Sequence, residues 1–190
     1  MKKLKNKAGL TLIEMLCTLL IMVLLVMAIG VGMDTGTRIY TDATFEAESA
    51  TLAGILNNSL GDILRYSMDV RVPSAAEKAE KGVPENVEFL FTSLDYGIQD
   101  AYFYTPQHEN GGYMGALQMK NIRNADVMDL VNEGAYPNLA VSNFVIKYID
   151  NDDKTRGVVG GYFDIDYTIY NEHDMTKSRK VDLIVRLMND

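Results

Sequence analysis

The sequence contains no tryptophan, one cysteine and two histidines among its 190 residues. The single cysteine, Cys17, excludes an intramolecular disulfide. The histidines, His108 and His173, lack the close spacing of a zinc motif, and no phosphate-binding loop, dinucleotide fingerprint or Gly-x-Ser-x-Gly motif occurs. Because no catalytic constellation is present, we predict that the protein is not an enzyme and uses no cofactor.

Basic residues are scarce beyond the first nine positions. The chain has 18 lysine and arginine residues against 26 aspartate and glutamate residues, a net charge of -8. Since Lys2, Lys3, Lys5 and Lys7 supply four of the 18, the remainder carries 14 basic and 26 acidic residues, or -12. An acidic surface repels phosphate, so we expect no direct nucleic-acid binding.

Charge is also absent from residues 15–33, which are all apolar, small or hydroxyl-bearing. As a helix with a rise of 1.5 Å per residue, this run would be about 28 Å long, close to the hydrocarbon thickness of a bilayer. Lysines precede the run and acidic residues follow it, so the positive-inside rule keeps the N-terminus cytoplasmic. We therefore predict a single-pass cell membrane protein whose C-terminal domain is exported.

The carboxylate of Glu14 lies at the start of this apolar run and needs a physical explanation. One interpretation is a capping box, in which Thr11 and Glu14 satisfy the first amides of a helix. Another is an ordinary secretory signal peptide cleaved after Gly30, which fits a small-x-small pattern with Ala28. That cleavage would release a soluble product beginning at Val31.

A third interpretation rests on the segment Ala-Gly-Leu-Thr-Leu-Ile-Glu, which begins at Ala8. Together with the short lysine-rich leader and the unbroken apolar helix, it resembles the leader of type IV prepilins and pseudopilins, over residues 2–33. The resemblance implies cleavage by a prepilin peptidase after Gly9, N-methylation of the new first residue Leu10, and an assembly role for Glu14.

Elementary electrostatics gives a reason for that assembly role. A charged side chain inside a membrane helix costs about 2.5–3.5 kcal/mol on insertion scales, so an isolated Glu14 would be unfavourable. Cleavage creates a cation at the amine of Leu10, and this amine can pair with Glu14 of a neighbouring subunit in a low-dielectric filament core. The capping interpretation remains compatible, because one carboxylate can serve both purposes at different stages.

The resemblance and the hydrophobic pattern together predict three segments. Residues 1–9 form the leader, residues 10–66 a long N-terminal helix with its transmembrane part at 15–33, and residues 67–190 an exported globular α+β head. In the second half of the helix, apolar residues recur at spacings of three, four or seven from Phe45 to Leu64. We also expect local unwinding around Gly30, Gly32 and Gly36, because glycine weakens a helix.

Within the head, Ser74 and Glu77 predict a short capped helix that ends at Gly82. Alternating segments predict strands at residues 87–93, 100–105, 113–120, 144–149, 162–170 and 180–188, and a further helix is expected at 125–133. The predicted fold class is α+β and pilin-like: a long helix, with a membrane half and an amphipathic half, packed on a C-terminal antiparallel sheet.

An acidic cluster of Asp150, Asp152 and Asp153 raises the question of calcium, which some major pseudopilins bind in a loop of the head. Asp and Asn are also the usual residues of a hairpin turn, and no further ligand is assignable. The residues favour a plain turn, with calcium as the alternative.

These observations lead us to expect a structural subunit, a minor pilin or pseudopilin of a type IV pilus, competence or type II secretion-like filament. The family implies partners: other pilin or pseudopilin subunits, a prepilin peptidase, an inner-membrane platform protein, an assembly ATPase and the lipid bilayer. The expected location is the membrane, then the cell surface or pilus. The alternative is a membrane-anchored extracellular binding domain that does not polymerise.

Overall fold

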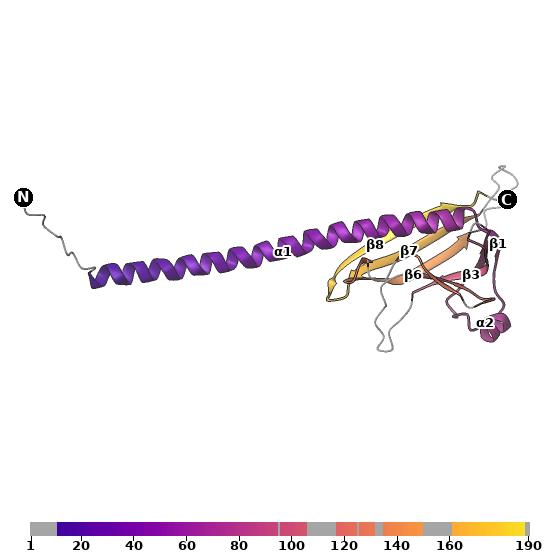
Figure 1. Ribbon diagram of the computed structural model, residues 1–190, viewed down its shortest axis with the longest axis horizontal. Helices are drawn as coiled ribbons and strands as arrows, with labels where there is room; N and C mark the ends of the chain where they lie inside the picture. Colours follow the sequence, from indigo (N-terminus) through magenta and orange to yellow (C-terminus); the bar gives the residue numbers. More distant parts are fainter. Residues whose placement is uncertain are drawn as a thin grey trace, which may run out of the picture. The chain divides into compact units, whose positions relative to one another are not determined.

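A computed structural model describes residues 11–94, 96–105, 117–124, 126–131, 135–149 and 161–188 (Figure 1). By contacts the chain divides into two compact units, Met1–Thr44 and Phe45–Asp190. The helices and strands, in chain order, are α1 (Leu12–Arg65), β1 (Met68–Arg71), α2 (Ala75–Lys81), β2 (Leu90–Ser93), β3 (Ile98–Tyr104), β4 (Gln118–Asn121), β5 (Val127–Asp129), β6 (Leu139–Ile149), β7 (Tyr162–Asn171) and β8 (Asp174–Arg186).

Helix α1 confirms the predicted N-terminal helix almost to the residue. It begins at Leu12 and ends at Arg65, and it is helical through Gly30, Gly32 and Gly36. The prediction of local unwinding at these glycines is therefore wrong for this chain. Each glycine costs up to about 1 kcal/mol in a helix but removes no backbone hydrogen bond, so the helix continues.

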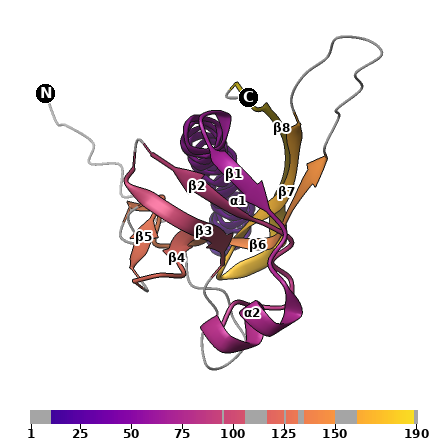
Figure 2. The ribbon, with the colours of Figure 1, turned by 90° about the vertical axis from the view of Figure 1, so that its right-hand side faces the viewer.

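The second unit contains two antiparallel sheets, which Figure 2 shows around the C-terminal part of α1. The first has the strand order β1-β2-β3-β4-β5 and the second the order β6-β7-β8. Strands consecutive in the chain are neighbours in both sheets, although the connection between β1 and β2 contains α2. The prediction of an α+β fold with a long helix on antiparallel strands is confirmed, with two sheets in place of the single sheet expected.

One hydrophobic core joins α1 to both sheets. The periodic apolar positions of the helix supply Leu56, Leu60 and Leu64, each completely buried. The strands meet them with alternating residues such as Phe91 and Phe163, also completely buried. Ile55, by contrast, belongs to the same periodic pattern but is 39% exposed, so the buried stripe is narrower than its sequence suggests.

A second, smaller cluster lies on the other face of the first sheet. Leu90 and Tyr102 alternate along β2 and β3 with Phe91 and Phe103 of the main core, so their side chains point to the opposite face. There they contact Val83 and Val87 from the connection that follows α2, and Tyr104 and Ile122 pack against the group. We call Val83, Val87, Leu90 and Tyr102 the satellite cluster.

Strand β8 is attached to α1 at two points. Arg179 Nη1 forms an ion pair with Glu46 Oε1 at 2.7 Å, and the N–H of Met188 donates to the carbonyl of Arg65 at 2.9 Å. From residue 179 to 188 a strand advances about 30 Å, and from 46 to 65 a helix advances about 28 Å. The matching lengths mean that β8 and this part of α1 run side by side in the same direction (Figure 1).

Two segments of the first sheet differ from the sequence prediction. The expected helix at residues 125–133 is wrong: residues 127–129 form strand β5, where Val127 pairs with Lys120 of β4. Val127, expected to face inward, is 49% exposed, because strand geometry turns alternate side chains outward. Residues 68–71, where the sequence predicted no strand, form β1, in which Met68 pairs with Thr92.

Candidate functional site

The N-terminal end of α1 carries the residues that the sequence singled out. Thr11 precedes the helix, and its backbone N–H and hydroxyl both donate to Glu14 Oε2, at 2.8 and 3.0 Å. The N–H of Glu14 donates in return to Thr11 Oγ1 at 3.3 Å. This is a reciprocal capping box, so the predicted capping contact is confirmed. Gly9 and Leu10, the predicted cleavage and methylation residues, lie outside the described residues.

The cap uses only part of what the Glu14 carboxylate can accept. Both donors from Thr11 reach the same oxygen, Oε2, and a carboxylate offers about four lone-pair sites. Within residues 11–94, Glu14 forms no ion pair, and the next charged residue along α1 is Asp34. Glu14 is exposed and lies in the first turn, where the helix dipole favours a negative charge.

The apolar part of α1 is exposed along its whole length. From Leu12 to Met33 the large apolar residues have exposed fractions between 50% and 82%. The helix is long and apolar enough to cross a membrane. Its polar groups are satisfied locally, since the Thr18 hydroxyl donates to the carbonyl of Met15 at 2.9 Å. Such a surface is stable in a bilayer or against other apolar helices, which fits a membrane-anchored, single-pass protein.

The head offers little that points to catalysis or metal binding. His173 lies in the turn between β7 and β8, where its N–H donates to Asn171 Oδ1 at 2.8 Å. No group of three metal-ligating side chains occurs among the described residues. His108 and the acidic cluster Asp150, Asp152 and Asp153 lie outside the described ranges, so the plain turn stays a prediction, with calcium as its alternative.

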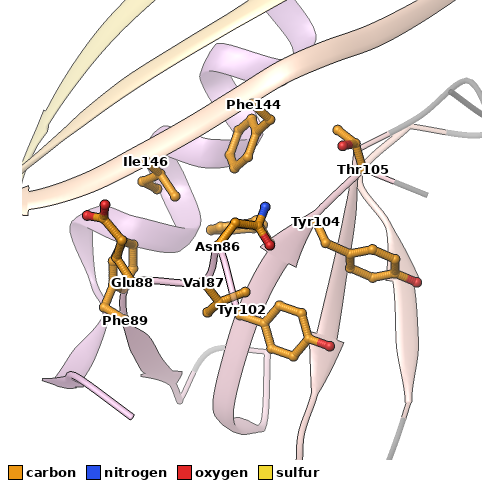
Figure 3. Close-up of a pocket in the computed structure, with 10 residues that line it drawn as sticks. Asn86, Val87, Glu88, Phe89, Tyr102, Tyr104, Thr105, Phe144 and Ile146 are labelled. Atoms are coloured by element: carbon orange, nitrogen blue, oxygen red, sulfur yellow. The ribbon is translucent and has the colours of Figure 1, made fainter. Parts of the chain in front are cut away.

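A small cleft of the head lies between the segment at residues 86–89 and strands β3 and β6. Its volume is about 30 Å³, which is room for about one water molecule. Figure 3 shows Val87 beside Tyr102, with Phe144 and Ile146 contributed by β6. The cleft is too small for an organic ligand.

An ion cluster in the head was not foreseen from the sequence. The guanidinium of Arg71 binds both oxygens of Glu77 at 2.8 Å and reaches Asp100 Oδ1 at 2.8 Å. Arg123 Nε donates to Asp100 Oδ2 at 2.9 Å, and Lys81 Nζ to Glu77 Oε1 at 3.1 Å. Most of these residues lie far apart in the chain, so the sequence could not predict their contacts. The sequence predicted only the position of Glu77 in the helix cap with Ser74.

The ion cluster shifts the ionisation of its members. Hydrogen bonds from Arg71, and then from Lys81, lower the pKa of Glu77 from 4.5 to about 2. Burial raises the pKa of Asp100, but the guanidinium groups of Arg71 and Arg123 outweigh it, and the net pKa is lowered. Both carboxyl groups are therefore ionised throughout the physiological pH range.

Comparison with protein families identifies the N-terminal segment. Residues 4–30 match the family model described as the prokaryotic N-terminal methylation motif. The chain carries the type IV pilin and pseudopilin signature. This motif includes the capping box at Thr11 and Glu14. Comparisons with curated proteins and with solved structures give no match.

Proposed function

We propose that the protein is a minor pilin or pseudopilin, a filament subunit of a type IV pilus, competence or type II secretion-like system. The observation that carries the proposal is the pilin-type motif at residues 4–30, which overlaps an apolar part of the helix. The large apolar side chains of that part, from Leu12 to Met33, are exposed. A membrane supplies a partner for that surface before assembly, and neighbouring helices supply one afterwards.

Processing would occur on the peptide bond between Gly9 and Leu10. A prepilin peptidase hydrolyses the bond, and the released amine of Leu10 is then methylated. Cleavage there leaves the N–H and hydroxyl of Thr11 in place, so the capping box remains intact in the mature chain. The lone-pair sites of Glu14 that Thr11 does not use are then available to the Leu10 amine of an adjacent subunit.

The same proposal assigns topology and partners. Lysines before the apolar run hold the N-terminus in the cytoplasm and direct the head outward. Assembly then requires other pilin or pseudopilin subunits, a platform protein and an ATPase. The subunit would move from the membrane to the cell surface or pilus.

A second candidate is a membrane-anchored extracellular binding domain that does not polymerise. One observation favours this candidate: Glu14 forms three hydrogen bonds with Thr11, so its presence has an explanation without any neighbouring subunit. In that case Glu14 matters only through the helix start, and removing either half of the cap should have the same effect.

Mass and N-terminal sequencing of the membrane-extracted protein test the processing step. A chain that begins at methylated Leu10 supports peptidase cleavage. A chain that begins at Met1 or Val31 would contradict the proposal, since neither product carries the amine that Glu14 requires.

Matched variants separate assembly from capping. We expect Glu14→Ala to be cleaved and to reach the membrane but to disappear from the sheared filament fraction. Thr11→Val, which removes the hydroxyl half of the cap, should still assemble. Glu48→Ala, an exposed acid farther along α1, is the control. Absence of the unaltered chain from the sheared filament fraction would favour the anchored binding domain. Equal loss in Glu14→Ala and Thr11→Val, or no loss in Glu14→Ala, would contradict an assembly role for Glu14 beyond the cap.

A further inference from the structure

The connection between β1 and β2, residues 72–88, is attached to the rest of the head at few points. It includes α2, which has no buried residue. The buried residues of the connection are Pro73, near its start, and Val83 and Val87, which enter the satellite cluster. The main core stops at Phe89, just beyond it. We call residues 72–88 the strap. Figure 2 shows α2 on the side of the sheets away from α1.

Hydrogen bonds of the strap are almost all internal. The Ser74 hydroxyl accepts from the N–H of Glu77 at 3.2 Å, and the N–H of Val83 donates to the carbonyl of Lys78 at 2.9 Å, with Gly82 in the left-handed conformation. Lys78 Nζ donates to the carbonyl of Glu85 at 3.0 Å. The strap is therefore a locally satisfied unit that keeps these bonds when it moves as a whole.

One ion pair provides the hydrogen bonds from the strap to the sheet. Among the described residues, the hydrogen bonds between the strap and the rest of the head are the two that Arg71 of β1 donates to the oxygens of Glu77, both at 2.8 Å. Arg71 is itself held by Asp100, whose side chain is 13% exposed, and so remains on the sheet if the strap departs. The Glu77 side chain is 19% exposed, hence within reach of solvent and salt.

From these contacts we propose that the strap opens as a unit while both sheets stay folded, with the Arg71–Glu77 ion pair as its catch. Opening removes Val83 and Val87 from the satellite cluster and uncovers Leu90 and Tyr102, which are 0% and 3% exposed in the closed state. The head would thus have a second state that displays an apolar strip on the outer face of β2 and β3.

The physical basis is the small number of interactions that close the strap. Local opening costs little where few apolar contacts are buried and few hydrogen bonds are lost. The two sheets, in contrast, share a continuous core with α1 and open only with the whole unit. Because the catch is a partly exposed ion pair, salt should weaken it, and protonation of Glu77 should release it as the pH falls from 4.5 toward about 2.

Hydrogen exchange of the full-length chain in detergent micelles tests this state. Peptides within residues 72–88 should exchange faster than peptides from β6 and β7. We expect Arg71→Met and Glu77→Gln each to accelerate exchange of the strap roughly five- to thirty-fold, the effect of losing one or two kcal/mol, and to leave β7 unchanged. Glu46→Gln breaks the ion pair with Arg179 and is the control, with no expected effect on the strap.

Two results would overturn the proposal. The first is an equal opening free energy for the amides of the strap and of β7. The strap would then unfold together with the sheets. The second is acceleration of the strap and β7 to the same extent by both variants. If Arg71→Met does not fold, the unaltered chain decides: raising NaCl from about 0.1 to about 1 M should accelerate only the strap, and no change contradicts the catch.

Discussion

Tyr167 joins α1 to the second sheet through one buried hydroxyl. This hydroxyl donates to Asn57 Oδ1 at 2.8 Å and lies 3.4 Å from the carbonyl of Ala53, while the whole residue is 2% exposed. Burial raises the pKa of the phenol well above 10, so the group stays a neutral donor. Tyr167 thus fixes the position of the helix over the strand as well as filling the core.

We expect Tyr167→Phe to lower the free energy of unfolding of the head by about 1–2 kcal/mol, because it leaves Asn57 without its partner. Urea unfolding followed by near-ultraviolet circular dichroism measures this, since all tyrosines except Tyr40 lie in Phe45–Asp190. Tyr162→Phe, on the half-buried face of β7, is the control. A similar loss in both variants would mean that the Asn57 contact contributes nothing.

Asp166 and Asp182 are directly opposite each other on β7 and β8, and both are exposed. The contact with Asp182 raises the pKa of Asp166, with smaller effects of burial and of Asp164, which Lys180 partly offsets. A carboxyl group whose folded pKa is raised stabilises the fold at low pH, and this contribution is lost as the pH rises through the folded value.

Removing this like-charge pair should stabilise the head at neutral pH. We expect Asp182→Asn to raise the free energy of unfolding at pH 7 by a few tenths of a kcal/mol and to leave it nearly unchanged below pH 4. Asp62→Asn, an exposed site on α1, serves as the comparison. An equal gain at both pH values would assign the effect to something other than ionisation.

At the scale of the element, the end of α1 depends on the last strand. The carbonyl of Leu64 accepts from the N–H and hydroxyl of Ser67, at 3.2 and 2.8 Å, and the carbonyl of Arg65 accepts from the N–H of Met188. These carbonyls have no partner within the helix. The chain after β8 therefore completes the hydrogen bonding of the helix.

The contact from Met188 is made by the backbone, which permits a sharp test. Met188→Pro removes the N–H and should lower the free energy of unfolding by roughly 0.5–1.5 kcal/mol. Met188→Ala keeps the N–H, and since the side chain is 66% exposed we expect almost no change. If the two variants unfold at the same urea concentration, the contact does not stabilise the helix end.

The elements that the sequence predicted well are those with long regular patterns. The bounds of helix α1 and strand β7 were close to correct, whereas β8, predicted at residues 180–188, begins six residues earlier at Asp174. Strand β5 was missed because three residues cannot show a period, and the apolar spacing around Val127 also fits a helix. Only tertiary pairing with β4 decides between the two.

The candidate site divides in the same way. The cap at Glu14 joins residues only three apart in the sequence, so the sequence pattern predicted it. The contacts of Tyr167 with Asn57 and of Arg71 with Asp100 join residues far apart in the chain, and no single-sequence pattern records such pairs. The N-terminal motif could be predicted because its residues are continuous in the sequence. The contacts that organise the head could not be predicted, because they join distant residues.

At the scale of the whole molecule, the acid response combines carboxyl groups of opposite behaviour. Glu77 and Asp100 have lowered pKa values, so they stabilise the folded head above their unfolded values of 4.5 and 3.8 and lose this effect as the pH falls. The raised pKa of Asp166 has the opposite effect: it stabilises the folded head at low pH, and this contribution is lost as the pH rises.

We therefore expect the free energy of unfolding of the full-length chain to decline from about pH 4.5 toward pH 2, where Glu77 becomes protonated. Arg71→Met, which removes the main cause of the lowered pKa, should flatten that decline. Urea titrations at several pH values measure it, with Glu46→Gln as a variant that leaves the Arg71 cluster intact. If the free energy of unfolding of Arg71→Met declines with pH as steeply as that of the unaltered chain, other carboxyl groups cause the decline.

The attachment to α1 at Arg179, within β8, and at Met188, just after it, has a mechanical consequence. Tension applied along residues 46–65 of the helix passes into β8 through Arg179 and Met188. Because the strand runs beside the helix, the load falls along the strand, and the ladder between β7 and β8 is sheared over its whole length instead of being unzipped pair by pair. A head built in this way resists pulling through its helix far better than peeling from the free edge of β6.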